Sequence, residues 1–185
     1  GRMIRIFGDS ISGNCQKVKW VATRLSRPHE WIEIDVLKGE TRTDAFLALN
    51  PFGQVPVIQF DDGRTLAQSN AIILHLAEGS DLIPGDAFER AKMLEWMFWE
   101  QYSHEPVIAV RRFQKLYLNT PDDEIDPDLL AKGRRALGRM EMALISSDWI
   151  AGGDAITLAD ISLLAYTRLS HEGGFDLNEF PAVQA

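Results

Sequence analysis

Residues 50–58 read NPFGQVPVI, and the order of prolines, glycine and aliphatic residues in this stretch organises the first half of the chain. The prolines and the glycine end any helix, while residues 57–58 begin an apolar strand. A DG pair at 62–63 is typical of a tight hairpin turn, so residues 65–66 are predicted to return as an antiparallel strand. Residues 68–77 then carry aliphatic side chains one turn apart, which predicts a helix after the hairpin.

The sequence before this stretch predicts a strand, a helix and a second strand. Residues 3–7 (MIRIF) alternate apolar and polar side chains as a strand does, and a run of turn-forming residues follows. Residues 14–25 space their apolar side chains as a helix does, and residues 31–36 (WIEIDV) alternate again. Such a unit has two parallel strands, and a short helix at 43–49 leads on to the hairpin. Residues 3–78 are therefore predicted to fold as βαβαββα.

The remainder of the chain predicts a linker and then helices. Gly79, Pro84 and Gly85 mark residues 80–86 as a linker, and no strand pattern follows them. The next segment is predicted to be a long helix that Pro106 kinks or interrupts. Apolar and aromatic residues at helical spacing mark one stripe of it: Phe88, Ala91, Leu94, Phe98 and Tyr102.

Two further helices are indicated nearer the end of the sequence. Leu130, Leu137 and Leu144 recur at helical spacing. Thr157 and Asp160 match a capping box, in which the acidic side chain reaches back to the amide of the Thr that caps the helix. We interpret this pair as a device that starts a helix after Thr157.

Composition and charge disfavour several classes of function. The 185 residues are 45% hydrophobic, so the chain can bury a core and is not expected to be disordered. A formal net charge of -8 and a pI near 5.0 disfavour binding to nucleic acid or to an anionic membrane. No stretch approaches the roughly 18 apolar residues of a membrane span, and no basic segment precedes an apolar signal core. We therefore expect a cytoplasmic protein.

The cysteine and histidine content argues against a metal centre. Cys15 is the one cysteine of the sequence, so it cannot form an internal disulfide. The histidines show no zinc-ligand spacing with each other or with Cys15. We expect a functional site that contains no metal ion.

The predicted order of elements, together with NPFGQVP at 50–56 and QSNAI at 68–72, resembles the soluble glutathione transferases, and most of all their bacterial theta- and nu-like members. The resemblance covers nearly the whole chain. It implies a thioredoxin-like domain at 1–79 that binds glutathione, a linker at 80–86, and an all-helical domain at 87–185 that lacks the last helix of the family. It also implies a cytosolic homodimer with glutathione as co-substrate.

The resemblance assigns the contacts with glutathione to two motifs. A cis Val55-Pro56 bond would present the Val55 backbone to the cysteinyl part of glutathione, as in strand addition. Gln68 and Ser69 open a helix, where the amides, the helix dipole and the Ser69 hydroxyl would hold the γ-glutamyl carboxylate. Without the resemblance, Ser69 is more simply a helix cap, and the proline a turn or edge residue. Weaker contacts with the glycine end of glutathione are implied for Gln54 and Lys38.

The segment DSISGNCQK at 9–17 lies where the family places the residue that activates the glutathione thiol. Ser12 lies three residues before Cys15, in the position of the exposed cysteine of a C-x-x-C motif, and we choose it as the donor to the glutathione sulfur. Without the resemblance, Ser12 is more simply a helix cap or turn residue. Asn14 matches an asparagine that some bacterial relatives use for this purpose, and Ser10 is a further candidate. Cys15 offers a rival mechanism as a thiol reductase, unless it is buried and behaves as a small apolar residue.

The second substrate is expected to be a small electrophile held between the thiol-activating loop and the first helices of the second domain. Tyr102, Phe113 and Leu116 are the candidates for this pocket, although aromatic residues at helical spacing are often part of a core. Arg111 and Arg112 fit either an anionic substrate or a solvated face.

Three functions remain open from the sequence. The leading interpretation is a transferase that conjugates the glutathione thiolate to an electrophile. Reduction of a peroxide or a disulfide by the same thiolate differs only in the second substrate. A non-catalytic binding or regulatory module is the third, and the retention of Ser12, Ser69 and the Val55-Pro56 pair argues against it.

Overall fold

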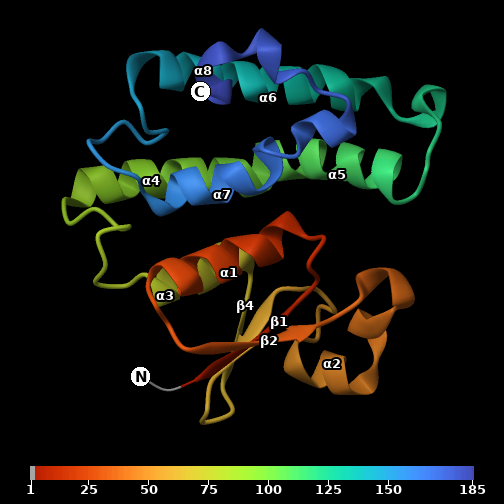
Figure 1. Ribbon diagram of the computed structural model, residues 1–185, viewed down its shortest axis with the longest axis vertical. Helices are drawn as coiled ribbons and strands as arrows, with labels where there is room; N and C mark the ends of the chain where they lie inside the picture. The colour runs from red at the N-terminus through yellow and green to blue at the C-terminus, as the bar shows by residue number, and fades with distance from the viewer. Residues whose placement is uncertain (1–2) are drawn as a thin grey trace. The chain divides into compact units, whose positions relative to one another are not determined.

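The computed structural model describes residues 3–185, which form two compact units, the first ending at Ile83 and the second beginning at Pro84 (Figure 1). The first unit contains strands and helices. The described residues of the second unit contain helices and no strand. The predicted fold class, a thioredoxin-like domain followed by a helical one, is confirmed. Residues 1 and 2, with which the predicted first domain begins, lie outside the described residues.

The first unit is built on a mixed sheet of four strands. They are β1 (Ile4–Gly8), β2 (His29–Glu33), β3 (Val57–Gln59) and β4 (Thr65–Ala67), in the order β2-β1-β3-β4. The pair β1 and β2 is parallel, while β3 runs antiparallel to both β1 and β4. The parallel unit and the hairpin predicted from the alternation and the DG turn are both present.

Three helices complete this unit: α1 (Gly13–Arg24), α2 (Asp44–Leu49) and α3 (Ser69–Leu76). In Figure 1, α1 and α3 lie together on one face of the sheet, and α2 lies on the other side of the strands. α1 and α3 each bury aliphatic side chains one turn apart, because that face meets the sheet, whereas α2 buries Phe46. Buried residues from these helices and the strands include Ile4, Ile6, Val18, Val21, Ile58, Ile72, Ile73 and Leu76.

The second strand differs from its predicted position. The alternation of residues 31–36 placed it there, but β2 ends at Glu33 and a short 3-10 helix covers Val36–Lys38. Two hydrogen bonds explain the difference: the Asp35 side chain accepts from the Lys38 amide at 3.2 Å, and the Val36 amide donates to the more distant Asp9 Oδ2 at 2.9 Å. Such side-chain bonds compete with a strand ladder for the backbone.

The second unit consists of helices of very different length. None of the described helices is both long enough and apolar enough to cross a membrane. The shorter 3-10 turns are Asp122–Glu124, Ser170–Gly173 and Leu177–Glu179. The α-helices are α4 (Ala87–Trp99), α5 (Glu105–Leu116), α6 (Pro127–Ser146), α7 (Leu158–Thr167) and α8 (Pro181–Gln184).

A π-helical segment, Glu100–His104, separates α4 from α5. Pro106 follows it in the first turn of α5. Proline has no amide hydrogen and its ring crowds the carbonyl four residues earlier, so the hydrogen-bond pattern must change on its N-terminal side. The predicted interruption is therefore present, and it lies in the turn before the proline.

The predicted stripe on the long helix faces solvent. Phe88, Phe98 and Tyr102 are exposed, with Tyr102 at 87%. The buried side chains of α4 are Met93, Trp96 and Met97. Both sets have helical spacing, so periodicity alone could not identify the buried face.

The capping box at the start of α7 is confirmed. The Thr157 side chain caps the helix, and Asp160 Oδ2 accepts a hydrogen bond from the Thr157 amide at 2.9 Å. Asp160 Oδ1 also accepts from the Ile150 amide at 2.9 Å, so the box joins the preceding loop to the helix.

We expect Thr157→Val to lower the free energy of unfolding by about 0.5–2 kcal/mol, because it removes the capping oxygen but keeps the shape of the side chain. Urea unfolding followed by circular dichroism measures the change. The control is Thr23→Val, at an exposed position in α1. Equal midpoints for the two variants would show that the cap does not stabilise the protein.

Candidate functional site

The strand register brings three chain segments to one end of the sheet. Phe7 of β1 lies opposite Val57 of β3, and Val57 lies opposite Ala67 of β4. The loop after β1, the residues before β3 and the residues after β4 therefore leave the sheet at the same end. These segments contain the Ser12 loop, the Val55-Pro56 pair and the Gln68-Ser69 pair.

Ser12 is the N-cap of α1 and is half-buried. Its hydroxyl oxygen accepts a hydrogen bond from the Cys15 amide at 3.4 Å, and its own amide donates to the Asp9 carbonyl at 3.0 Å. Its hydroxyl also interacts with the Cys15 side chain. A hydroxyl can accept one hydrogen bond and donate another at the same time. Capping uses only the oxygen of Ser12. Its hydrogen can therefore turn from the neutral Cys15 thiol to a stronger acceptor.

Ser10 is exposed, and its hydrogen-bond donors face a carboxylate. Its hydroxyl donates to Glu33 Oε1 at 2.6 Å and its amide to Glu33 Oε2 at 3.0 Å, while the Trp31 indole donates to the same carboxylate at 2.8 Å. Partial desolvation acts to raise the pKa of Glu33, but these bonds outweigh it and the pKa is lowered. The Ser10 hydroxyl is thus engaged, which favours Ser12 over Ser10 as a donor to a bound sulfur.

Asn14 and Ser69 join the first turns of α1 and α3. The Ser69 hydroxyl donates to Asn14 Oδ1 at 3.2 Å. The Lys17 ammonium, which is fully buried, donates to Ser69 Oγ at 3.4 Å and to Asn70 Oδ1 at 3.3 Å. The predicted residues Asn14 and Ser69 are therefore neighbours. The contribution of Lys17 was missed, because a lysine in a helix is normally solvated and only its burial distinguishes it.

Gln68 precedes α3 in an unusual backbone conformation, with φ 72° and ψ 114°. Gln68 is the N-cap and Ser69 is the first residue of the helix, so the simpler interpretation of Ser69 as the cap is wrong. A residue other than glycine at positive φ costs about 1–3 kcal/mol and is often found at functional sites. The exposed Gln68 side chain makes no capping hydrogen bond.

We expect Gln68→Gly to be about 1 kcal/mol more stable than Gln68→Ala, since glycine tolerates positive φ and both variants lack the side-chain amide. Chemical denaturation measures the difference. Ala71→Gly, at an exposed position inside α3, should have the opposite sign and destabilise by about 0.5–1 kcal/mol. If glycine is unfavourable at both positions, the backbone at residue 68 is not strained.

The Val55-Pro56 peptide bond is cis, as the sequence predicted. Within residues 3–185, the Val55 amide and carbonyl have no hydrogen-bond partner. Gln54 is exposed, and its carbonyl accepts a hydrogen bond from Asn50 Nδ2 at 2.9 Å. The buried Asn50 side chain therefore holds the turn that presents residues 54–56.

Lys38 ends the 3-10 helix that follows β2. Its ammonium lies 3.9 Å from Asp35 Oδ2, and its side chain is 78% exposed. An ion pair this exposed contributes about 0–1 kcal/mol to stability, so it leaves the ammonium able to turn toward another anion.

Cys15 is fully buried in the first turn of α1. Burial raises the pKa of its thiol to about 11, against the lowering effect of hydrogen bonds from the Ser12 hydroxyl and the Asp9 amide. The thiolate is the nucleophile, so this environment disfavours the rival thiol-reductase mechanism.

We expect Cys15 to resist a thiol reagent in the native protein at pH 8. With a pKa of about 11 its thiolate fraction is about one in a thousand, compared with about a quarter for a free cysteine. Labelling with a chromogenic disulfide should be slow in buffer and rapid in denaturant. Fast labelling without denaturant would contradict the burial and revive the reductase mechanism.

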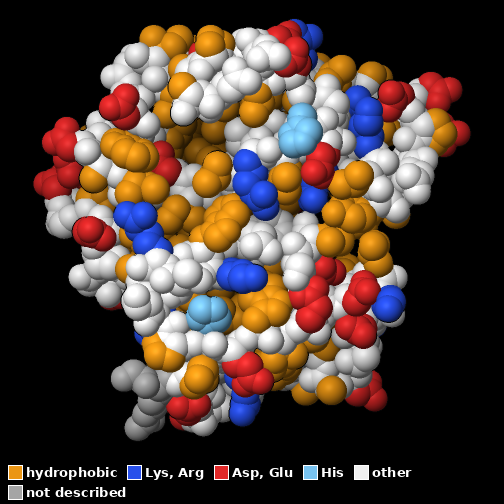
Figure 2. Space-filling model, viewed as in Figure 1, with side chains coloured by type: hydrophobic (Ala, Val, Ile, Leu, Met, Phe, Trp, Pro, Cys, Tyr) orange, Lys and Arg blue, Asp and Glu red, His pale blue; other side chains and the backbone are white. Residues whose placement is uncertain are grey.

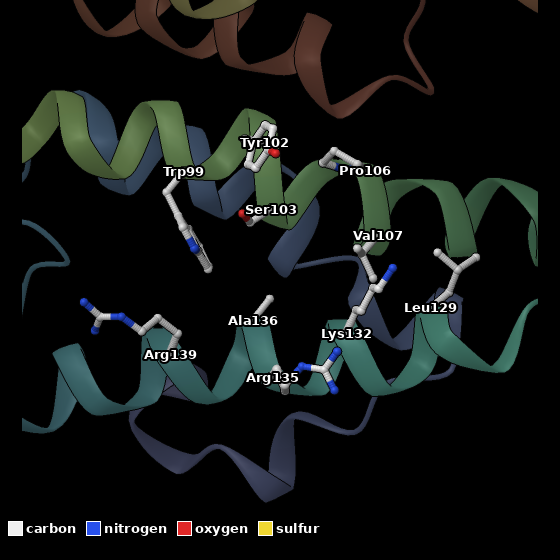
Figure 3. Close-up of a pocket in the computed structure, with 10 residues that line it drawn as sticks. All are labelled: Trp99, Tyr102, Ser103, Pro106, Val107, Leu129, Lys132, Arg135, Ala136 and Arg139. Atoms are coloured by element: carbon white, nitrogen blue, oxygen red, sulfur yellow. The ribbon is translucent and has the colours of Figure 1, made fainter.

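The helical unit contains a cavity of ≈ 520 Å³ between α6 and the segment that joins α4 to α5. In Figure 3, Trp99 points from α4 toward α6, which contributes Lys132, Arg135 and Arg139. The lining contains no acidic side chain. Figure 2 shows the molecule from the side seen in Figure 1, on which apolar, acidic and basic side chains are interspersed.

The three predicted electrophile-pocket residues are not brought together in this cavity. Tyr102 lines it, whereas Phe113 lies 5.8 Å from the Tyr117 ring and Leu116 is 44% exposed. Arg111 and Arg112 form no solvated face, because both are buried and hydrogen-bond within the helical unit to Gly173 and Glu172 respectively.

In the described part of the chain, no three His, Cys, Asp or Glu side chains are placed to hold a metal ion.

Comparison with known proteins identifies the relatives of this chain. Residues 11–78 match the family model "Glutathione S-transferase, N-terminal domain". The chain is 30% identical over 172 residues to the "Probable glutathione S-transferase GSTF2" of Oryza sativa subsp. japonica, covering 89% of this chain and 79% of that protein.

Solved structures agree as well. A glutathione S-transferase crystal structure from Pseudomonas fluorescens Pf-5 superimposes with a TM-score of 0.94 at 44% identity, covering 98% of this chain and 90% of the other. The fold is also that of Ure2p in complex with glutathione, with a TM-score of 0.88 at 23% identity and coverage of 99% and 86%. The chain belongs to the glutathione S-transferase family.

Proposed function

We propose that this protein binds glutathione, converts its thiol to the thiolate with the Ser12 hydroxyl, and transfers it to a small electrophile. The observation that carries the proposal is the place of Ser12: a half-buried hydroxyl at the amino end of α1, in a loop that leaves the sheet at the same end as the turn with Val55-Pro56. Asn14 is the second candidate donor, through its side-chain amide.

One hydroxyl and one helix end can supply the free energy needed to lower the pKa of the glutathione thiol. A thiol with a pKa of about 8.5 is only a few per cent ionised at pH 7, and lowering its pKa by two units requires about 2.7 kcal/mol. A hydrogen bond to a charged acceptor contributes about 1.5–3 kcal/mol, and the helix dipole about 0.3–1 kcal/mol. Ser12 and the amino end of α1 together supply this stabilisation, so a general base is not required for it.

The proposed contacts are distributed along the whole glutathione molecule. The Val55 backbone pairs with the cysteinyl residue as an added strand, beside the cis Pro56 bond. The first turn of α3, with Ser69 and Gln68, takes the γ-glutamyl carboxylate. The Lys17 ammonium, 3.4 Å from Ser69 Oγ, adds positive charge behind this site. Gln54 and Lys38 are proposed for the glycine carboxylate.

Further parts of the proposal rest on family membership. Tyr102, Phe113 and Leu116 are proposed to contribute to the electrophile pocket, and the protein is proposed to be a cytoplasmic homodimer with no metal ion. The proposed domains are 1–79 and 87–185, joined by a linker at 80–86. Ure2p, which shares the fold, supports glutathione as the ligand because it has been solved with glutathione bound.

We expect Ser12→Gly to lower turnover at pH 7 roughly tenfold or more while the dissociation constant for glutathione changes little, because the hydroxyl acts on the sulfur anion. Glycine is chosen because it replaces a serine N-cap at a cost of only a few tenths of a kcal/mol. Steady-state kinetics and calorimetric titration give the two quantities. An unaltered rate would reject Ser12 as the activating group.

Three further variants serve as controls for Ser12→Gly. Ser12→Thr retains a hydroxyl and should keep most of the activity. Ser10→Ala removes a hydroxyl that is bonded to Glu33, and should affect turnover less than Ser12→Gly. Ser69→Ala should weaken glutathione binding and leave turnover at saturation nearly unchanged.

The reaction type is tested with purified protein and glutathione against three substrates in parallel: a chromogenic aryl halide, an organic peroxide and a mixed disulfide. Conjugation of the aryl halide supports the proposal. Activity only with the peroxide or the disulfide would assign the same thiolate to a reduction. Absence of all three activities and of glutathione binding would indicate a non-catalytic module.

A further inference from the structure

Asp9 is a buried carboxylate that the proposed function does not use. It is 4% exposed and directly follows β1. Its Oδ1 accepts a hydrogen bond from the Ile11 amide at 3.0 Å, and its Oδ2 accepts one from the Val36 amide at 2.9 Å. One carboxylate therefore ties the loop between β1 and α1 to the chain that leaves β2.

The backbone of Asp9 adds two hydrogen bonds inside the same loop. Its carbonyl accepts from the Ser12 amide at 3.0 Å, and its amide donates to Cys15 Sγ at 3.4 Å. Main chain and side chain of this one residue thus fix the turn over residues 9–12. The direction in which the Ser12 hydroxyl leaves the loop depends on that turn.

Charge alone would make Asp9 unsuitable beside a sulfur anion. The charges of Asp9 and Glu33 both act to raise the pKa of the Cys15 thiol in this loop. They would act in the same direction on the thiol of a bound ligand. A carboxylate is, however, a stronger acceptor for backbone amides than a neutral group. A carboxylate at position 9 is therefore suited to holding the loop in place.

We infer that Asp9 is the positioning residue of the thiol-activating loop: by joining the loop to residue 36, its carboxylate holds the Ser12 hydroxyl where it donates to the glutathione sulfur. The inference rests on the proposed function, because it concerns how Ser12 lowers the pKa of the bound thiol. Asp9 acts through Ser12 and touches no substrate.

The pKa of the glutathione thiol bound to the full chain tests this inference, because positioning and charge predict shifts of opposite sign. Asp9→Asn removes the charge and replaces one acceptor oxygen with an NH₂ group. Positioning predicts a pKa rise of about one unit, and so roughly tenfold less thiolate at pH values below the pKa. Ultraviolet titration of the thiolate measures it. A lower or unchanged pKa would overturn the inference.

Val36→Pro is a second variant that keeps the charge of Asp9 and removes the amide bonded to its Oδ2. Val36 is the first residue of the 3-10 helix and follows an extended Asp35 with ψ 103°, a setting that proline tolerates. The thiol pKa should rise as in Asp9→Asn. Asp44→Pro, at the equivalent position of α2, should leave it unchanged. A wild-type pKa in Val36→Pro would show that the tie to residue 36 is not used, against the inference.

The unaltered chain separates this inference from the proposed function. If it does not bind glutathione, or leaves the thiol pKa at its solution value, both fall. If it lowers the thiol pKa and Asp9→Asn lowers it equally, only the role of Asp9 falls. The pH profile supplies a further readout: a positioning defect is recovered at pH values above the raised pKa, whereas a loss of folded protein lowers the rate at every pH.

Discussion

The pairing of β3 with both β1 and β4 is the constraint on which the candidate site depends. It sets Phe7 against Val57 and Val57 against Ala67, so that three segments far apart in the sequence leave the sheet at one end. A slip of one residue in this register would turn each side chain to the opposite face of the sheet. The core and the site are therefore specified by the same hydrogen bonds, and a change that weakens the hairpin should affect both.

Most of the fold could be predicted from the sequence, because its decisive signals are local. The DG turn produced the hairpin from β3 to β4, and the Thr157 to Asp160 box produced the start of α7. In both cases the residues that cause the structure are within a few positions of it. Ser12 caps α1, and the role toward a bound thiol for which the position of Cys15 singled it out stays a prediction.

The features that were missed depend on contacts between distant residues. The end of β2 is set by Asp9, twenty-seven positions before the Val36 amide that it binds. The burial of Lys17 depends on its hydrogen-bond partners on α3. On α4, the exposed and the buried stripes have the same spacing, and only the packing of the buried face distinguishes them. The roles of the site residues toward glutathione are a different matter, since no side-chain contact within the chain can establish them and they stay predictions.

The order of the strands also bears on how this protein behaves at high concentration. The sheet ends in β2 on one side and β4 on the other, and an outermost strand offers backbone groups to a strand from another molecule. β4 is only three residues long, and β2 carries the exposed acids Glu30 and Glu33. A short edge and a charged edge both oppose intermolecular strand addition, so the sheet is a poor template for aggregation.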